Sequence, residues 1–183
     1  MSNFLKAALG VSLALAWMTA VPPVQAQNLA TCTGTVTVEF DPPFTTTPQL
    51  ITATTTTTYP LCVISVSPFI MSAVSIEVQS IPVPLSCADL ESSELLSFGG
   101  QAFTATIDWS SGPDSTFNAS GTRTDVQGLT FVTTAEGTIT SGRFAGGAAR
   151  RQNVYPTIQQ MLTPCATEGL ERVTGASVLT ITT

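Results

Sequence analysis

Apolar and polar residues alternate with a period of two along much of the chain. Residues 35–40 place Val36, Val38 and Phe40 on one face and Thr and Glu on the other. The same alternation recurs in three further segments, residues 74–79, 103–109 and 177–181. This period is typical of β-strands with one face on a hydrophobic core and one face in water. We therefore expect the apolar set of each segment, including Ile76 and Val78, to face the core.

Turn-forming residues separate these segments, as in Asp41-Pro42-Pro43 and in residues 110–114. The run Thr54–Thr58 predicts an exposed strand; a glycosylated stalk is the alternative. Residues 88–96 and 156–162 predict one or two short helical turns, with Pro156 at the first position of the second. The pattern as a whole predicts an all-β fold. An antiparallel β-sandwich is favoured, and a small closed β-barrel is the alternative.

The first 26 residues have the features of a secretory signal peptide. Lys6 precedes an apolar stretch, Pro22-Pro23 follows it, and Val24-Gln25-Ala26 supplies small residues at the cleavage site. The stretch is short for a spanning helix, so we expect no membrane span after the leader is removed. Residues 27–183 are then a single β-domain that is secreted to the extracellular space or to the periplasm.

All four cysteines follow the leader, and export brings them to an oxidising compartment. Four cysteines allow three pairings. We favour Cys32–Cys62 with Cys87–Cys165, because Cys32 opens one predicted strand and Cys62 closes the next, so a hairpin would place them opposite each other. No Cys-x-x-Cys motif is present, so structural disulfides are expected rather than a redox-active pair.

The composition excludes several classes of function. The chain has no histidine, and its lone lysine is Lys6, within the predicted leader. Catalytic Ser-His-Asp and Cys-His sites, Schiff-base lysines, P-loops and zinc sites that need histidine are therefore excluded. A pI near 4.3 and the lack of a basic run argue against nucleic-acid binding. No cofactor is expected.

Carboxylates remain as the only general acids and bases. A glycoside hydrolase needs two of them beside a sugar cleft. Glu39 with Asp41 and Asp108 with Asp114 are the nearest pairs, but twelve acids on a small domain produce such pairs by chance. Trp109 follows the inner-face alternation, so it is interpreted as a core residue rather than a sugar platform.

Other candidate features have a simple structural interpretation beside the functional one. The densest acidic cluster, Asp89, Glu91 and Glu94, is the candidate for calcium, although a solvated acidic loop explains it more simply. The pair Arg150-Arg151 could be a processing site or an anion contact, with a solvated loop pair as the default interpretation. The sequon at residues 118–120 is expected to be unused.

The segment from Met161 to Cys165 is the candidate for a protease-inhibitor loop, since Pro164 and a disulfide would stiffen it. The alternative is that Met161 and Leu162 pack the underside of a short helix, and this alternative is favoured.

Four short sequence segments that follow the predicted leader together resemble a loose group of small exported, Thr-rich, all-β bacterial proteins of the actinobacterial type. These segments are CTGT (32–35), TIDWSSG (106–112), GTITSGRFAG (137–146) and CATEG (165–169). The resemblance implies one exported β-domain and adds no catalytic residue. The sequence as a whole predicts a non-catalytic protein that binds an extracellular or cell-surface partner of unknown identity or associates with a surface. A protease inhibitor and a carboxylate-dependent glycoside hydrolase are the alternatives.

Overall fold

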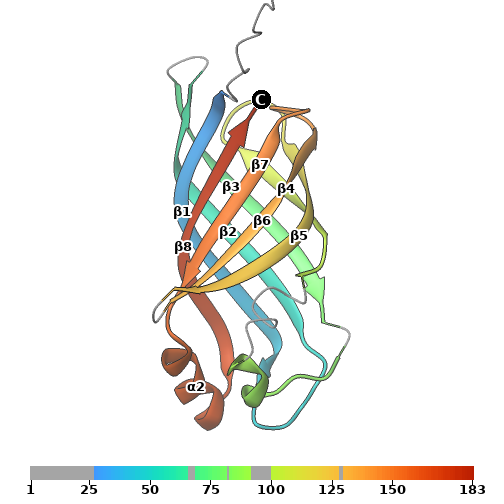
Figure 1. Ribbon diagram of the computed structural model, residues 1–183, viewed down its shortest axis with the longest axis vertical. Coiled ribbons are helices and arrows are strands. Elements are labelled where there is room, and N and C mark those ends of the chain that lie inside the picture. The colour runs from blue at the N-terminus through green and yellow to red at the C-terminus, as the bar shows by residue number, and fades with distance from the viewer. Residues whose placement is uncertain (1–26, 66–68, 82, 92–99, 128–129) are drawn as a thin grey trace, which may run out of the picture.

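The chain folds into a closed barrel of eight antiparallel strands that follow one another in sequence order (Figure 1). The computed structural model describes residues 27–65, 69–81, 83–91, 100–127 and 130–183. The predicted signal peptide therefore lies outside the described residues. The strands are β1 (Asn28–Phe44), β2 (Thr52–Ile64), β3 (Phe69–Ser80), β4 (Phe103–Trp109), β5 (Ser115–Gln127), β6 (Thr130–Ser141), β7 (Ala148–Tyr155) and β8 (Leu170–Thr182).

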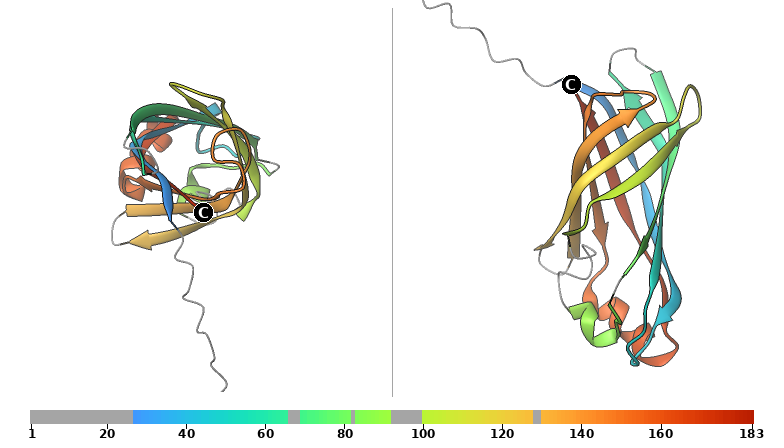
Figure 2. Two further views of the ribbon diagram at one scale, coloured as in Figure 1. Left: turned by 90° about the horizontal axis from the view of Figure 1, so that it is seen from above. Right: turned by 90° about the vertical axis from the view of Figure 1, so that its right-hand side faces the viewer.

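Pairing between the first and last strands closes the sheet on itself. Strand β1 pairs with β2 on one side and with β8 on the other, so Cys32 is flanked by Cys62 and Leu179. Seen from above, the strands form a ring (Figure 2). The all-β prediction is confirmed, whereas the preference for a sandwich is wrong. Alternation reveals which face of a strand is buried, but it does not reveal whether the two ends of a sheet meet.

The inward side chains form two hydrophobic clusters, one toward each end of the barrel. The cluster near the chain termini includes Trp109, Phe117 and Ile139. The cluster at the opposite end includes Val36, Phe131 and Met161 among others. The core interpretation of Trp109 is confirmed, since it is 3% exposed and its Nε1 donates a hydrogen bond to Ser115 Oγ.

Strand β3 has the reverse orientation from the one its pattern predicts. Ile76 and Val78 are 51% and 63% exposed on the outer face, while Ser75 and Glu77 are buried at 2% and 5%. The register with β2 explains this orientation. Ser75 lies opposite the inward-facing Thr57, so the polar set of β3 must share the barrel interior with it. The prediction that Ile76 and Val78 face the core is therefore wrong.

Two other polar segments also prove to be parts of the barrel wall. The run of threonines lies within β2, where Thr55 and Thr57 are buried and Thr58 is exposed. Its prediction as a strand is confirmed, but only one of its faces is exposed. Arg150 and Arg151 lie within β7 rather than in a solvated loop, and Arg151 is buried. Asn118 of the sequon is an exposed position of β5.

Two helical elements lie at the end of the barrel opposite the C-terminus (Figure 1). The 3-10 helix η1 (Cys87–Glu91) falls within the first predicted helical turn, whose remaining residues, 92–96, lie outside the described residues. Helix α2 (Ile158–Thr167) begins later and ends later than predicted. Pro156 precedes it and Thr157 is its N-cap, so Pro156 does not occupy the first helical position.

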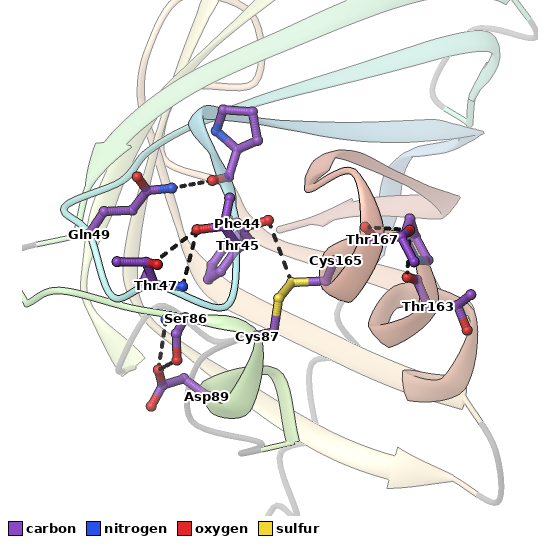
Figure 3. Close-up of a disulfide and its surroundings, with 12 residues drawn as sticks. Phe44, Thr45, Thr47, Gln49, Ser86, Cys87, Asp89, Thr163, Cys165 and Thr167 are labelled. Atoms are coloured by element: carbon purple, nitrogen blue, oxygen red, sulfur yellow. Dashed lines mark hydrogen bonds between the residues drawn. A yellow bond between two sulfur atoms is a disulfide. The ribbon is translucent and has the colours of Figure 1, made fainter.

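Two disulfides crosslink the fold, and they join the pairs that the sequence analysis favours. Cys32 and Cys62 are direct partners in the β1–β2 ladder. Cys87–Cys165 joins η1 to α2 across the end of the barrel, where Cys165 Sγ lies 3.6 Å from the carbonyl oxygen of Phe44 (Figure 3). The second disulfide therefore holds both helical elements against the last residue of β1.

Candidate functional site

A belt of polar side chains crosses the barrel interior between the two hydrophobic clusters. We call this set the polar belt, and its members come from β2, β3, β7 and β8. They are Thr57, Tyr59, Ser75, Glu77, Arg151, Asn153, Tyr155 and Ser177. All occupy inward positions of their strands, and in β3 these polar residues alternate with the exposed Ile76 and Val78, so the belt does not arise from a simple amphipathic pattern.

An ion pair lies at the centre of the polar belt. Arg151 Nη2 donates a hydrogen bond to Glu77 Oε2 over 2.5 Å, from β7 to β3 on the opposite wall. The guanidinium carbon also lies 4.9 Å from the centre of the Phe103 ring. An arginine that is desolvated, paired and stacked on an aromatic ring is held in a defined position.

Burial and mutual attraction act in opposite directions on the two charged groups. Burial raises the pKa of the Glu77 carboxyl above its usual 4.5, and the attraction of Arg151 offsets only part of this effect. Burial by itself would lower the pKa of Arg151, but Glu77 and the tyrosine hydroxyls keep that pKa above its ordinary value. The two groups form an ion pair, and their opposite charges cancel.

A chain of hydrogen bonds runs beside the ion pair. Ser177 Oγ donates to Asn153 Oδ1 over 2.7 Å, and Asn153 Nδ2 donates to Tyr155 Oη over 3.2 Å. Because the Ser177 hydroxyl has one proton, the Tyr59 hydroxyl donates to Ser177 Oγ over 3.2 Å. Burial raises the pKa of both phenols, that of Tyr155 to about 12. Each of these four side chains therefore has a hydrogen-bond partner within the series.

Other polar atoms of the interior lack a hydrogen-bond partner. Within the described part of the chain, six buried side-chain atoms have none, and one of these six, Arg143 Nε, lies in a loop. The other five occupy inward positions of the barrel strands: Thr57 Oγ1, Ser75 Oγ, Gln79 Oε1, Thr124 Oγ1 and Arg151 Nε. A buried polar atom without any partner costs about 1–3 kcal/mol, and the protein itself supplies none for these five atoms, so they are available to a bound molecule.

Of the side chains in the predicted calcium cluster, the structure describes that of Asp89 alone. Asp89 Oδ2 accepts hydrogen bonds from the backbone N–H and the hydroxyl of Ser86, as Figure 3 shows. Glu91 closes η1, and Glu94 lies outside the described residues. Over the described ranges, no group of three or more acidic, cysteine or histidine residues has the arrangement of a metal site.

The carboxylate pairs proposed for hydrolysis lie on the outer surface. Glu39, Asp41, Asp108 and Asp114 are all exposed. Among the acidic side chains that the structure describes, Glu77 is the only buried one. A second carboxylate beside it, as a glycoside hydrolase requires, is not found within that part of the chain.

The segment proposed as an inhibitor loop is helical. Met161 lies within α2 and is buried in the hydrophobic cluster at that end of the barrel. Its side chain packs inward, as the alternative interpretation of this residue predicts. Residues 161–165 therefore do not form the exposed loop on which the inhibitor hypothesis depends.

The sequence analysis missed Glu77 and Arg151 as partners. Each residue has a signal in hindsight: Glu77 is the charged member of the polar set in a regular alternation, and Arg151 alternates with Ala149 and Asn153 in a short segment. Neither signal identifies which face of the strand is buried. The partnership needs the closed barrel, which places β3 opposite β7.

Comparisons of the chain with protein-family models, curated proteins and solved structures find no match. Over the residues that the structure describes, no helix has the length and apolar character needed to cross a membrane. The two disulfides suggest an oxidising environment outside the cytoplasm.

Proposed function

We propose that this protein is an exported, non-catalytic binding protein and that the polar belt is its ligand site. The observation that carries the proposal is the group of five unpartnered polar atoms at inward strand positions, three of which, Thr57 Oγ1, Ser75 Oγ and Arg151 Nε, belong to the polar belt. They come from β2, β3, β5 and β7, so they surround the interior rather than marking one defect in the packing.

The architecture supports a small ligand. A barrel of eight strands has an interior that side chains can just fill or that can hold one small molecule. Small residues line the wall around the ion pair: Ala135 is the register partner of Arg151, and Thr57 is the partner of Ser75. The two hydrophobic clusters exclude water from both ends, which strengthens polar contacts between them.

The chemistry of the polar belt supports binding rather than catalysis. Its carboxylate accepts a hydrogen bond from Arg151, and its phenols have raised pKa values that keep them protonated at neutral pH, so both kinds of group serve as hydrogen-bonding partners. These groups orient a molecule well, because their own positions are held by hydrogen bonds and by packing.

The test uses the ¹⁵N-labelled protein with both disulfides formed. Arg side chains give separate Nε–Hε signals in nuclear magnetic resonance spectra, and residues 27–183 contain five arginines. The protein is titrated with acetamide, acetate, acetamidinium and glycerol. We expect at least one probe to move the Arg151 signal in a saturable way while the signal of the exposed Arg150 stays in place. If none of the four probes moves the Arg151 signal, the proposal is wrong.

A double variant tests the same site independently of the ion pair. The variant Thr57→Val/Ser75→Ala replaces two unpartnered hydroxyls by groups of similar shape. We expect the ligand-free variant to be as stable as the wild type or more stable, and to bind the active probe more weakly. Thr56→Val, which alters the next position on the same strand, is the control and should leave binding unchanged. Equal binding by all three proteins would contradict the proposal.

A further inference from the structure

The charges and hydrogen-bonding groups of the polar belt restrict the class of ligand. We infer that the natural ligand is a small uncharged molecule that both accepts and donates hydrogen bonds. This inference rests on the proposed function and specifies the chemistry of the same site.

The charge of the site excludes ions from this class. Glu77 and Arg151 are the only buried charged side chains within the described ranges, and they neutralise each other. An anion or a cation would bring an uncompensated charge into an interior closed by hydrophobic clusters, which is strongly unfavourable. An anion would also compete with Glu77 for Arg151, whose Nη2 is already engaged.

The unpartnered atoms require a ligand with two kinds of group. Arg151 Nε can only donate a hydrogen bond, so it needs an acceptor. Gln79 occupies the next inward position of β3 after Glu77 of the polar belt, and its Oε1 can only accept, so it needs a donor. The hydroxyls of Thr57 and Ser75, direct partners across β2 and β3, can serve either purpose. Amides and alcohols carry both kinds of group without a net charge.

Three probes of nearly identical shape separate the possibilities. Acetate, acetamide and acetamidinium have the same heavy-atom skeleton and carry a negative, a zero and a positive charge. At neutral pH and constant ionic strength, we expect acetamide to saturate the Arg151 Nε–Hε shift at a concentration at least about tenfold lower than either ion. Glycerol, an uncharged alcohol, should also be preferred to the ions.

A charge-changing variant sharpens the experiment. Among the side chains that the structure describes, Glu77→Gln leaves Arg151 as the only buried charge, so the preference should reverse and acetate should bind best. If this variant does not fold, the wild-type comparison alone decides. Retention of the wild-type preference by a folded Glu77→Gln protein would contradict the inference.

The outcomes distinguish this inference from the proposed function. If acetate or acetamidinium is the preferred probe of the wild type, the polar belt is a binding site, but the inference that its ligand is uncharged is wrong. If none of the probes moves the Arg151 signal, both the inference and the proposed function are wrong. In that case the unpartnered atoms are matched by water alone.

Discussion

Arg150 and Arg151 are consecutive residues of β7, yet their guanidinium groups lie on opposite sides of the barrel wall. Arg150 Nε lies 3.4 Å from Glu136 Oε1 on the outer surface, and both side chains are about half exposed. Arg151 extends inward to Glu77, and both of those side chains are buried. The chain thus contains two ion pairs on neighbouring residues that differ mainly in their exposure to water.

This arrangement predicts a large difference in stability between two equivalent substitutions. Arg151→Met leaves the buried Glu77 charge without a partner, and we expect a loss of about 3–5 kcal/mol of unfolding free energy. Arg150→Met removes an exposed pair and should cost less than about 1 kcal/mol. Urea denaturation of the oxidised protein measures both values. The double variant Glu77→Leu with Arg151→Met should recover most of the loss, because it removes both charges together.

The reversed orientation of β3 gives a second prediction. Ile76→Thr changes an exposed side chain and should alter the unfolding free energy by no more than about 0.5 kcal/mol. Ile107→Thr makes the same chemical change at a buried position of β4, directly opposite Ser75. It removes core packing and buries a hydroxyl, so a loss of roughly 2–4 kcal/mol is expected. Similar costs at both positions would contradict the assigned orientation of β3.

The outcome for β3 shows how far the sequence predicts this fold. In β1 and β4 the apolar residues of each alternation do face the core, since Val36, Val38 and Ile107 are all buried. In β3 the alternation is equally regular and yet reversed. A strand's own pattern cannot show this, because the ion pair with Arg151 on the opposite wall satisfies the inward position of Glu77. The assumption that fails is that only hydrophobic residues occupy the inward positions.

The candidate site was less accessible to prediction than the fold. Local patterns identify strands and a helix near residues 156–162, because these depend on neighbours in sequence, and the ends of two adjacent strands indicate the pairing of Cys32 with Cys62. The polar belt depends on contacts such as Tyr59 with Ser177, which are 118 residues apart. Closure of the barrel creates these contacts, and the register of each ladder determines which polar residues meet.

The two disulfides should contribute unequally to stability. Cys87–Cys165 spans 78 residues and Cys32–Cys62 spans 30. Loop-closure entropy alone gives roughly 4.5 kcal/mol for the longer loop and roughly 3.6 kcal/mol for the shorter one. Replacing Cys87 and Cys165 by Ser should therefore lower the urea midpoint more than replacing Cys32 and Cys62. A smaller effect for the longer loop would show that strain or residual structure outweighs chain entropy.

Both tyrosines of the chain, Tyr59 and Tyr155, belong to the polar belt, so tyrosine ionisation reports on this site alone. Burial raises the pKa of each phenol from 10.0, that of Tyr155 to about 12. The unfolded chain ionises near 10 while the folded chain keeps its protons. The contribution of Tyr155 to stability is therefore complete below pH 10 and is lost as the pH rises toward about 12.

The measurement is a titration of phenolate absorbance alongside circular dichroism. We expect no phenolate signal near pH 10 while the dichroism is native, and then the ionisation of both tyrosines together with alkaline unfolding. Tyr155→Phe removes one of the two raised groups, so its stability should fall less steeply above pH 10. It also leaves Asn153 Nδ2 without its acceptor, which should lower stability at neutral pH. A phenol that ionises near 10 in the folded wild type would show that the polar belt is open to solvent.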